Sequence, residues 1–522
     1  MFSSELAHEV FKILYKILTK NLASGVPTQP YSLNFPGNPT FNPGIFLQRP
    51  SVSCYGTSKM KRKIYSLDYN SLNYNMKPLI DRREELRALE EWYNKGRVAL
   101  IFGRRRVGKT RLVLEFITNK RAVYLLAADS TLEYNLAKFS DELSERFSVP
   151  GLRFRDFDEL FRFIDGRSDV DIVVIDEFGY LVKAGALPQF QRIVDLILDT
   201  KKLVLTGSTI SAIESKLLGY RSPLYGRLDL VKKIQPLRFH HLFEWFPGAT
   251  FDGAIAVYGA TGGVPRYLEF FSKCTGDEVE KVMLNPDILP FRDAKLIIEE
   301  ELPEPHRYFQ ILEAIAGGRT RLSEISHVTG IEPHKLPYYL GVLRDLGYVY
   351  YEKPLLEGKR GTYRVKEPYF AFWFRFIYPF YEEIESGLKT HAETYFRKNF
   401  NTYLGQVFEQ VAGELVLQKI KHTKAGRWWK GDTEIDLIAI DEDTAKAYFI
   451  EFKYSSDVDP ETELDKLKKK TALFGWKKDT RKEEYIVVAK SFKKQSSQAT
   501  TIDQQKLHQI ALETLNNERE KY

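Results

Sequence analysis

The residues between Gly103 and Thr110 have the types and spacing of a phosphate-binding loop. They read Gly-Arg-Arg-Arg-Val-Gly-Lys-Thr and fit the pattern G-x-x-x-x-G-K-[ST], with an apolar strand expected before them and an amphipathic helix after them. Glycines permit the tight turn in which backbone N–H groups face an anion, and a helix that starts at Lys109 adds the positive end of its dipole. We expect Lys109 to reach the β- and γ-phosphates of a nucleotide and the Thr110 hydroxyl to hold Mg²⁺. The predicted nucleotide-binding residues of the loop are Gly103, Arg104, Arg105, Arg106, Val107, Gly108, Lys109, Thr110 and Arg111.

Two carboxylates, Asp176 and Glu177, end an apolar run that begins at residue 171. In a parallel sheet the ligand lies beyond the carboxyl ends of the strands, so both side chains should lie beside the phosphates. We expect Asp176 to help hold Mg²⁺ and Glu177 to orient or deprotonate the attacking water.

Two further polar residues follow later strands and carry weaker signals. Thr206 or Ser208 could touch the γ-phosphate or the attacking water, or simply end a strand in a turn. Arg227 could supply positive charge to the transition state, in cis or across a subunit interface, or be a surface arginine in a turn. A homo-oligomer is therefore one possible assembly.

The segment from 79 to 271 resembles AAA+/STAND-type P-loop ATPases, most closely an archaeal ATPase family that reads G-R-R-R-x-G-K-T at this loop. Asp81-Arg82-x-x-Glu85 resembles the family's element beside the adenine, with Asp81 where glycine is usual. Gly262-Gly-Val-Pro265-Arg resembles the motif whose proline lies against the base. The resemblance implies that Arg82 and Pro265 bind the nucleotide and that ATP and Mg²⁺ are the cofactors.

A second set of candidate catalytic residues lies near the C-terminus. Glu409 is on an expected helix, Asp436 on an expected strand from 427 to 440, and Glu451 and Lys453 on a strand from 446 to 453. Residues i and i+2 of a strand share a face, and strand pairing can bring Asp436 alongside them. Such a group suits Mg²⁺-dependent phosphodiester cleavage, in which Asp436 and Glu451 hold the metal and Lys453 steadies or deprotonates the nucleophilic water.

This order of helix Glu, strand Asp and strand Glu-x-Lys resembles the PD-(D/E)xK nuclease superfamily, specifically the nuclease-like domain fused to archaeal ATPases of this kind. The resemblance implies a restriction-endonuclease-like α/β domain. Charged residues that alternate along a strand also occur without any catalytic role.

Between these two regions the sequence predicts three short helices and a hairpin, which resemble a winged helix. Its third helix could dock on DNA, or the module could pack against the rest of the chain. The aromatic run from 368 to 381 is expected to fill a core between domains rather than to stack on bases. The candidate DNA-contacting residues are Lys335, Tyr338, Arg344, Lys359 and Arg360.

The predicted fold class is multidomain α/β: a P-loop NTPase parallel sheet with a helical lid, a winged-helix domain and a restriction-endonuclease-like α/β domain. The expected parts are a disordered or extraneous extension over 1–75, an ATPase core over 76–240 and a lid over 241–303. A winged helix with an aromatic linker over 304–385 and the nuclease-like domain over 386–522 complete the chain.

The amino-acid composition narrows the cellular compartment and the kinds of partner that are expected. A net charge of +7 and a pI near 8.9 are mildly basic for 522 residues and make DNA a candidate partner. Two cysteines, Cys54 and Cys274, cannot build a disulfide framework, which favours the reducing cytoplasm. No apolar run reaches membrane-spanning length, so no membrane partner is expected.

The sequence therefore predicts an ATP-binding and ATP-hydrolysing protein coupled to a metal-dependent nuclease-like domain that acts on nucleic acid, DNA above all. Two alternatives stay open. One is a nucleotide-switched DNA-binding regulator whose nuclease fold is catalytically silent. The other is an ATP-dependent scaffold for protein partners.

Overall fold

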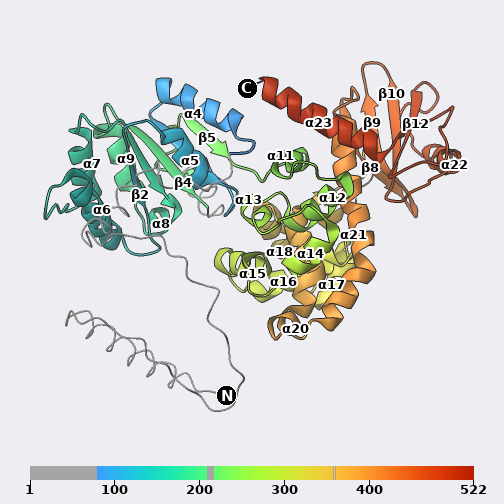
Figure 1. Cartoon of the computed structure of the whole chain (residues 1–522), viewed down its shortest axis with the longest axis horizontal. Helices are drawn as coiled ribbons and strands as arrows, with labels where there is room; N and C mark the ends of the chain where they lie inside the picture. Colours follow the sequence, from blue (N-terminus) through green and yellow to red (C-terminus); the bar gives the residue numbers. More distant parts are fainter. Residues whose placement is uncertain (1–78, 209–216, 221, 357, 359, 522) are drawn as a thin grey trace, which may run out of the picture. The chain divides into compact units, whose positions relative to one another are not determined.

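The computed structural model describes residues 79–208, 217–220, 222–356, 358 and 360–521 (Figure 1). The expected extension over 1–75, which contains Cys54, lies outside the described residues, as does Lys359. Within the described part, no helix combines the length and the apolar character needed to cross a membrane.

The N-terminal half of the described chain is built on a parallel five-stranded sheet in the order β2-β3-β4-β1-β5. Every residue of β1 and β3 is buried, which matches the continuous apolar sequence typical of parallel strands covered on both faces. The strands are β1 (Val98–Phe102), β2 (Ala122–Leu126), β3 (Ile172–Asp176), β4 (Lys202–Gly207) and β5 (Leu230–Lys233). The predicted parallel α/β fold is confirmed for this region.

Successive residues of β1 enter two hydrophobic cores on opposite faces of the sheet. Val98 and Leu100 pack in one core, whereas Ala99 and Ile101 pack in the other, because strand side chains alternate between faces. The first core is closed by α6 (Leu132–Phe147), α7 (Phe157–Asp165), α8 (Phe178–Lys183) and α9 (Leu187–Leu196), and the second by α4 (Arg83–Lys95) and α5 (Lys109–Ile117).

The chain then becomes helical. A 3₁₀ turn, η3 (Phe239–His241), leads into five α-helices that share one large hydrophobic core with the rest of the C-terminal half. These helices are α11 (Leu242–Trp245), α12 (Phe251–Thr261), α13 (Pro265–Leu268), α14 (Gly276–Met283) and α15 (Leu289–Glu301).

Three helices and an antiparallel hairpin follow, in the order that the sequence predicts. Leu336, Leu340 and Leu343 are the buried face of α18, and Pro337 lies in its first turn, where its missing N–H leaves no helical hydrogen bond unmade. The elements are α16 (Pro305–Ala316), α17 (Leu322–Thr329), α18 (Leu336–Asp345), β6 (Val349–Glu352) and β7 (Thr362–Val365).

The aromatic run forms a chain of short helical segments buried in the large core. Phe370, Phe372, Trp373, Phe374 and Phe376 are each at most 2% exposed, so the expectation of a core rather than a base-stacking surface is confirmed. The segments are α19 (Pro368–Phe372), a π-helical turn η4 (Trp373–Ile377), a 3₁₀ turn η5 (Tyr378–Phe380) and α20 (Tyr381–Glu385).

The C-terminal region is a mixed five-stranded sheet in the order β12-β11-β10-β9-β8, in which β8 to β10 are antiparallel and β10 to β12 are parallel. Its elements are α21 (Thr390–Leu417), β8 (Lys424–Lys430), β9 (Thr433–Asp441), β10 (Lys446–Lys453), α22 (Pro460–Thr471), β11 (Lys482–Ala489), β12 (Thr500–Ile502) and α23 (Gln504–Lys521).

Two expectations for this region were wrong in detail. The single strand expected over 427–440 is split into β8 and β9, because Gly431 takes a φ of 62° and turns the chain back on itself. The helix expected around Glu409, for which the sequence indicated a start at Gly405, begins instead at Thr390, since Phe396 and Phe400 extend its buried face against the aromatic core.

Candidate nucleotide and acidic sites

The loop between β1 and α5 depends on its two glycines. Gly103 has a φ of 151°, and a Cβ there would lie 2.4 Å from the carbonyl oxygen of Ile234. Gly108 has a φ of 95° and immediately precedes Lys109, the first residue of α5. Only glycine adopts such conformations without steric cost, so the loop can turn tightly around the N-terminus of α5.

A cavity of about 950 Å³ lies beside this loop, which is the size range of small-ligand sites. Most of the predicted nucleotide-binding residues line it, but Gly103, Arg104 and Ser208 are not among its lining residues. The predicted residues on its wall are Arg82, Arg105, Arg106, Val107, Gly108, Lys109, Thr110, Arg111, Glu177 and Pro265.

Lys109 is buried at the floor of this cavity, where it is 5% exposed. Its Nζ donates a hydrogen bond to the carbonyl oxygen of Arg104 over 2.8 Å. Burial lowers the pKa of the Lys109 ammonium to about 8, and the neighbouring charges of Glu177 and Asp176 only partly oppose this effect. An anion bound in the loop would restore the charged form.

We therefore expect ATP binding to take up a proton above pH 8. Below that pH Lys109 is already charged, whereas above it the free protein holds a neutral amine that the phosphates re-protonate. Calorimetric titrations in buffers of different ionisation enthalpy should give close to one proton taken up at about pH 9 and little at about pH 7. The difference between the two pH values should vanish in Lys109→Arg, because the guanidinium stays charged. Equal proton uptake at both pH values in the wild type would contradict re-protonation of Lys109 by the bound phosphates.

Asp176, at the end of β3, accepts hydrogen bonds from three hydroxyl groups. Thr110 Oγ1 donates to Oδ2 over 2.8 Å, Tyr124 donates to the same oxygen, and Thr206 donates to Oδ1. The two predicted Mg²⁺ residues are thus in direct contact, and their carboxylate and hydroxyl oxygens are the ligand types that Mg²⁺ prefers.

Sequence reasoning missed Tyr124, and for Thr206 it considered a contact with the phosphate or the water, or a plain strand end, but not the hydrogen bond to Asp176. The available signal was strand register: Leu126 of β2 lies beside Asp176 of β3, and Tyr124 is two residues earlier on the same face.

Glu177 lines the cavity directly after the buried Asp176. Its backbone is left-handed, with a φ of 54°, and its Oε2 accepts a hydrogen bond from the Ser208 hydroxyl over 2.7 Å. Ser208 therefore orients the carboxylate that is predicted to handle the attacking water, whereas the sequence placed Ser208 itself at the nucleotide.

Arg82, Trp245 and Pro265 line the cavity outside the phosphate loop and suit a base. Arg82 is 4% exposed, and its Nη2 donates to the carbonyl oxygens of Val107 over 3.1 Å and of Gln235 over 2.8 Å. Asp81 has a φ of 46°, a conformation that favours glycine and explains the usual glycine at this position. Pro265 and Trp245 supply apolar surface on this wall, and sequence reasoning did not single out the tryptophan.

Three consecutive arginines of the loop are ion-paired with acidic residues that lie far away in the sequence. Arg105 Nη2 lies 2.6 Å from Glu300 Oε1, and Arg106 pairs with Asp293; both partners are on α15. Arg104 pairs with Glu367 just before α19.

The predicted nucleotide contact of the Arg104 side chain is not supported, because its guanidinium points away from the cavity. It donates to the carbonyl oxygen of Gly347 over 3.1 Å and lies 4.6 Å from the ring centroid of Tyr348.

Arg227 is placed away from the cavity as well. It makes a two-pronged pair with Asp195 of α9, with Nε–Oδ1 and Nη2–Oδ2 distances of 2.7 and 2.8 Å, and it does not line the cavity. This geometry disfavours the in-cis alternative for Arg227 and leaves a role across a subunit interface as a prediction.

The predicted acidic residues of the C-terminal sheet lie on neighbouring antiparallel strands. Leu437 of β9 is opposite Ile450 of β10, and one further step places Asp436 opposite Glu451 on the same face as Lys453. Burial raises the pKa of Asp436, and the charge of Glu451 raises it further. Glu451 is 4% exposed and pairs over 2.8 Å with both Lys453 and Lys470.

Lys453 suits one of its two predicted roles better than the other. Burial lowers its pKa, but the hydrogen bond to Glu451 and the negative charges of Glu451, Glu463 and Asp436 together outweigh burial and leave the pKa above its usual value. A permanently charged ammonium can steady a nucleophile but cannot deprotonate it.

Glu409 of α21 pairs with Arg427 of β8, and it lines a cavity of about 300 Å³ together with Asp436. Among the described side chains, the one group of at least three close enough to share a metal ion is His240, His241 and Glu518, so the structure does not bring Glu409, Asp436 and Glu451 together around one ion. Sequence reasoning put Glu409 nearer to them because it could not foresee the ion pair with Arg427.

Comparison with known proteins gives two family matches. Residues 79–271 match an ATPase domain found predominantly in Archaea, and residues 373–470 match a family of archaeal and bacterial proteins of unknown function. An uncharacterized protein of Methanocaldococcus jannaschii, MJECL04, is 36% identical over 429 residues, which cover 79% of this chain and 95% of the relative. A second protein of that organism, the uncharacterized ATP-binding protein MJ0423, is 44% identical over 50 residues, or 9% of this chain and 85% of the relative.

Among solved structures, the Walker-type ATPase PABY2304 of Pyrococcus abyssi has a TM-score of 0.45 and 24% identity, and the match covers 57% of this chain and 96% of that one. The Aeropyrum pernix Orc1 protein in complex with DNA has a TM-score of 0.32 and 18% identity, with 64% and 98% coverage. The identity with MJECL04 along nearly its whole length and the match of the ATPase domain show the family. This chain belongs to the same family as MJECL04, and its residues 79–271 are an ATPase domain of the type found predominantly in Archaea.

Proposed function

We propose that this protein hydrolyses ATP and couples the nucleotide state to a metal-dependent nuclease-like domain that acts on DNA. The observation that carries the nuclease part is the placement of Asp436 opposite Glu451, beside the charged Lys453. Burial raises the pKa of Asp436 and the charge of Glu451 raises it further, and a divalent cation between the two carboxylates would relieve their repulsion.

In the nucleotide site, each residue has a role that follows from its position. Thr110 and Asp176 would hold Mg²⁺, which supplies positive charge to the β- and γ-phosphates. Lys109 binds the same phosphates from the cavity floor, and Glu177, held by Ser208, orients the attacking water.

The loop arginines connect the nucleotide cavity to α15, which supports coupling of the nucleotide state to the helical region that follows the ATPase sheet. Arg105 and Arg106 both line the nucleotide cavity and at the same time hold Glu300 and Asp293 of α15. An arriving γ-phosphate would compete with Glu300 for the partly exposed Arg105 and would weaken that contact between α15 and the loop, whereas the buried Arg106–Asp293 pair would stay closed.

The metal-dependent cutting of labelled duplex, single-stranded and branched DNA tests the nuclease part. With Mg²⁺ or Mn²⁺, we expect cutting by the wild type and a loss of about 10²-fold or more in Asp436→Ala and Lys453→Ala. Glu484→Gln removes an exposed carboxylate of β11 in the same sheet, which pairs with Lys446, and should cut normally. Cutting that persists in Asp436→Ala would exclude this site.

A nucleotide-switched DNA-binding regulator is a second candidate, and one observation favours it. Lys453 and Lys470 both neutralise Glu451, and Arg427 neutralises Glu409, as expected for a fold that has kept its carboxylates without a metal. Lys335, just before α18, pairs with Glu332, and Arg344 of α18 pairs with Asp345, so DNA docking would rest mainly on the exposed Tyr338 and on Arg360. DNA binding without cutting at any metal would select this candidate, and no binding even at low salt would leave a scaffold for protein partners.

A further inference from the structure

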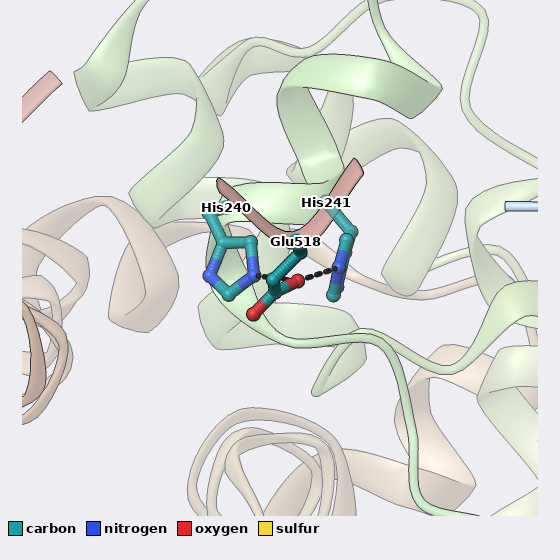
Figure 2. A group of neighbouring side chains, drawn as sticks. All are labelled: His240, His241 and Glu518. Atoms are coloured by element: carbon teal, nitrogen blue, oxygen red, sulfur yellow. Dashed lines mark hydrogen bonds and ion pairs between the residues drawn. The ribbon is translucent and has the colours of Figure 1, made fainter. Parts of the chain in front are cut away.

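Three side chains from distant parts of the sequence meet near the nucleotide site. His240 and His241 are in the turn η3, and Glu518 is on the last helix, α23 (Figure 2). His240 Nε2 lies 3.1 Å and His241 Nε2 lies 3.0 Å from the same oxygen, Oε2 of Glu518. Both histidines are almost fully buried, at 3% and 1% exposure.

This set of atoms is a ligand set for a divalent transition metal. Two imidazole nitrogens and a carboxylate oxygen form the His₂Glu combination that binds Zn²⁺ and leaves a fourth position for water. The three ligand atoms lie within 4.8 Å of one another, and the ligands of a four-coordinate ion at ~2.0 to 2.2 Å stand roughly 3.3 Å apart. Small side-chain movements therefore suffice to place an ion between them.

Two charged side chains lie next to the proposed ligands. Nδ1 of His241 lies 3.2 Å from Asp81 Oδ2 without a hydrogen bond between them, and a small rotation of either side chain would give the contact that a metal-bound histidine commonly makes with a carboxylate. The other oxygen of Glu518, Oε1, lies 2.8 Å from Arg238 Nη2. Arg238 opposes a cation, but its side chain is 57% exposed, so solvent screens its charge.

The space beside these side chains also suits a metal. A cavity of about 20 Å³, lined by His241, Glu518 and Asp81 among others, has room for one water as the fourth ligand.

We propose that His240, His241 and Glu518 form a site for one divalent transition-metal ion of the Zn²⁺ class. Such an ion ties α23 to η3. One of its ligands, His241, lies next to Asp81, and Asp81 directly precedes Arg82, which lines the nucleotide cavity. The ion would thus hold the C-terminal helix against the segment that forms the base side of the ATP cavity.

Metal binding to the untagged full-length protein, first depleted with a chelator, tests the proposal. Titration with Zn²⁺ should give one ion per chain, and Glu518→Gln should weaken this binding by at least about 10-fold. Glutamine keeps the size and an acceptor oxygen for the imidazoles, so the fold should persist. Glu513→Gln, on the same helix and paired with Lys419 over 2.7 Å, is the matched control and should bind as the wild type does.

Co²⁺ gives an independent readout of the ligands. Bound at this site, it should develop the visible absorption of a low-coordinate His₂Glu ion, and His241→Asn should lose that spectrum even where Glu518→Gln retains weak binding. Mg²⁺ should not compete with Zn²⁺, because imidazole is a poor ligand for it. Failure of the wild type to bind Zn²⁺, or equal binding by wild type, Glu518→Gln and His241→Asn, would overturn the proposal.

Discussion

Replacing Glu177 with glutamine should lower the rate of ATP turnover by about 10²- to 10⁴-fold while ATP binding stays close to wild type. Glutamine can still accept the hydrogen bond that Ser208 donates to Glu177, so the side chain keeps its place. It has neither the charge nor the basicity to orient and activate water. Steady-state turnover and the Kd for ATP, measured on the same preparation, separate the two effects.

The matched control for Glu177 is Glu269→Gln. Glu269 is a second carboxylate that lines the cavity, but it is exposed and pairs with Arg266 rather than with a residue of the sheet. Its replacement should leave turnover within a few-fold of wild type. Equal losses in both variants, or full turnover in Glu177→Gln, would show that another group handles the water.

Arg106→Ala should destabilise the protein by about 3 kcal/mol, because it strands a buried charge. Its partner Asp293 is 1% exposed and would keep only the hydrogen bond from the Tyr267 hydroxyl. The loss should appear as a lower Tm and as a smaller denaturant concentration at the unfolding midpoint.

The double variant Arg106→Ala/Asp293→Asn distinguishes a stranded charge from lost packing. Asparagine removes the charge, so the double variant should recover a large part of the stability that the single variant loses. Arg105→Ala is the matched single control, because the Arg105–Glu300 pair is partly exposed and should contribute less than about 1 kcal/mol. A double variant that is less stable than Arg106→Ala would refute the buried-pair argument.

The parts of the nucleotide site that could be predicted are those that depend on local sequence. The glycines of the loop, Lys109, Thr110 and the strand-ending Asp176 and Glu177 are each close in sequence to the element that positions them. The parallel sheet followed from apolar strands that alternate with helices. The hairpin after α18 was predictable because two segments rich in residues that favour strands, now β6 and β7, are joined by a stretch that contains glycine.

What could not be predicted are the contacts between residues far apart in the sequence. Arg104 points to Glu367 rather than to the nucleotide, and Glu518 reaches histidines 278 and 277 residues away. No local pattern encodes such pairs, since they depend on how whole elements pack. The same reason explains why the position of Glu409 was predicted wrongly: Glu409 of α21 forms an ion pair with Arg427 of β8.

The strand boundaries near Gly431 were predicted wrongly for a different reason. The alternation of Trp428, Glu434 and Asp436 continues through the turn and suggests one strand, but a glycine with a positive φ reverses the chain and places the two halves side by side.

The most direct test of the coupled ATPase and nuclease is the rate of DNA cutting with Mg²⁺, measured with ATP and without it. The variants to compare are wild type, Glu177→Gln, which should remain ATP-bound, and Asp436→Ala. We predict that ATP changes the cutting rate of the wild type. Glu177→Gln with ATP should keep the cutting rate of the ATP-bound wild type, because it does not hydrolyse the nucleotide. Asp436→Ala should not cut with ATP or without it. Cutting that depends on Asp436 but is the same with ATP, without ATP and in Glu177→Gln would contradict the coupling, and no cutting by the wild type on any DNA would contradict the nuclease.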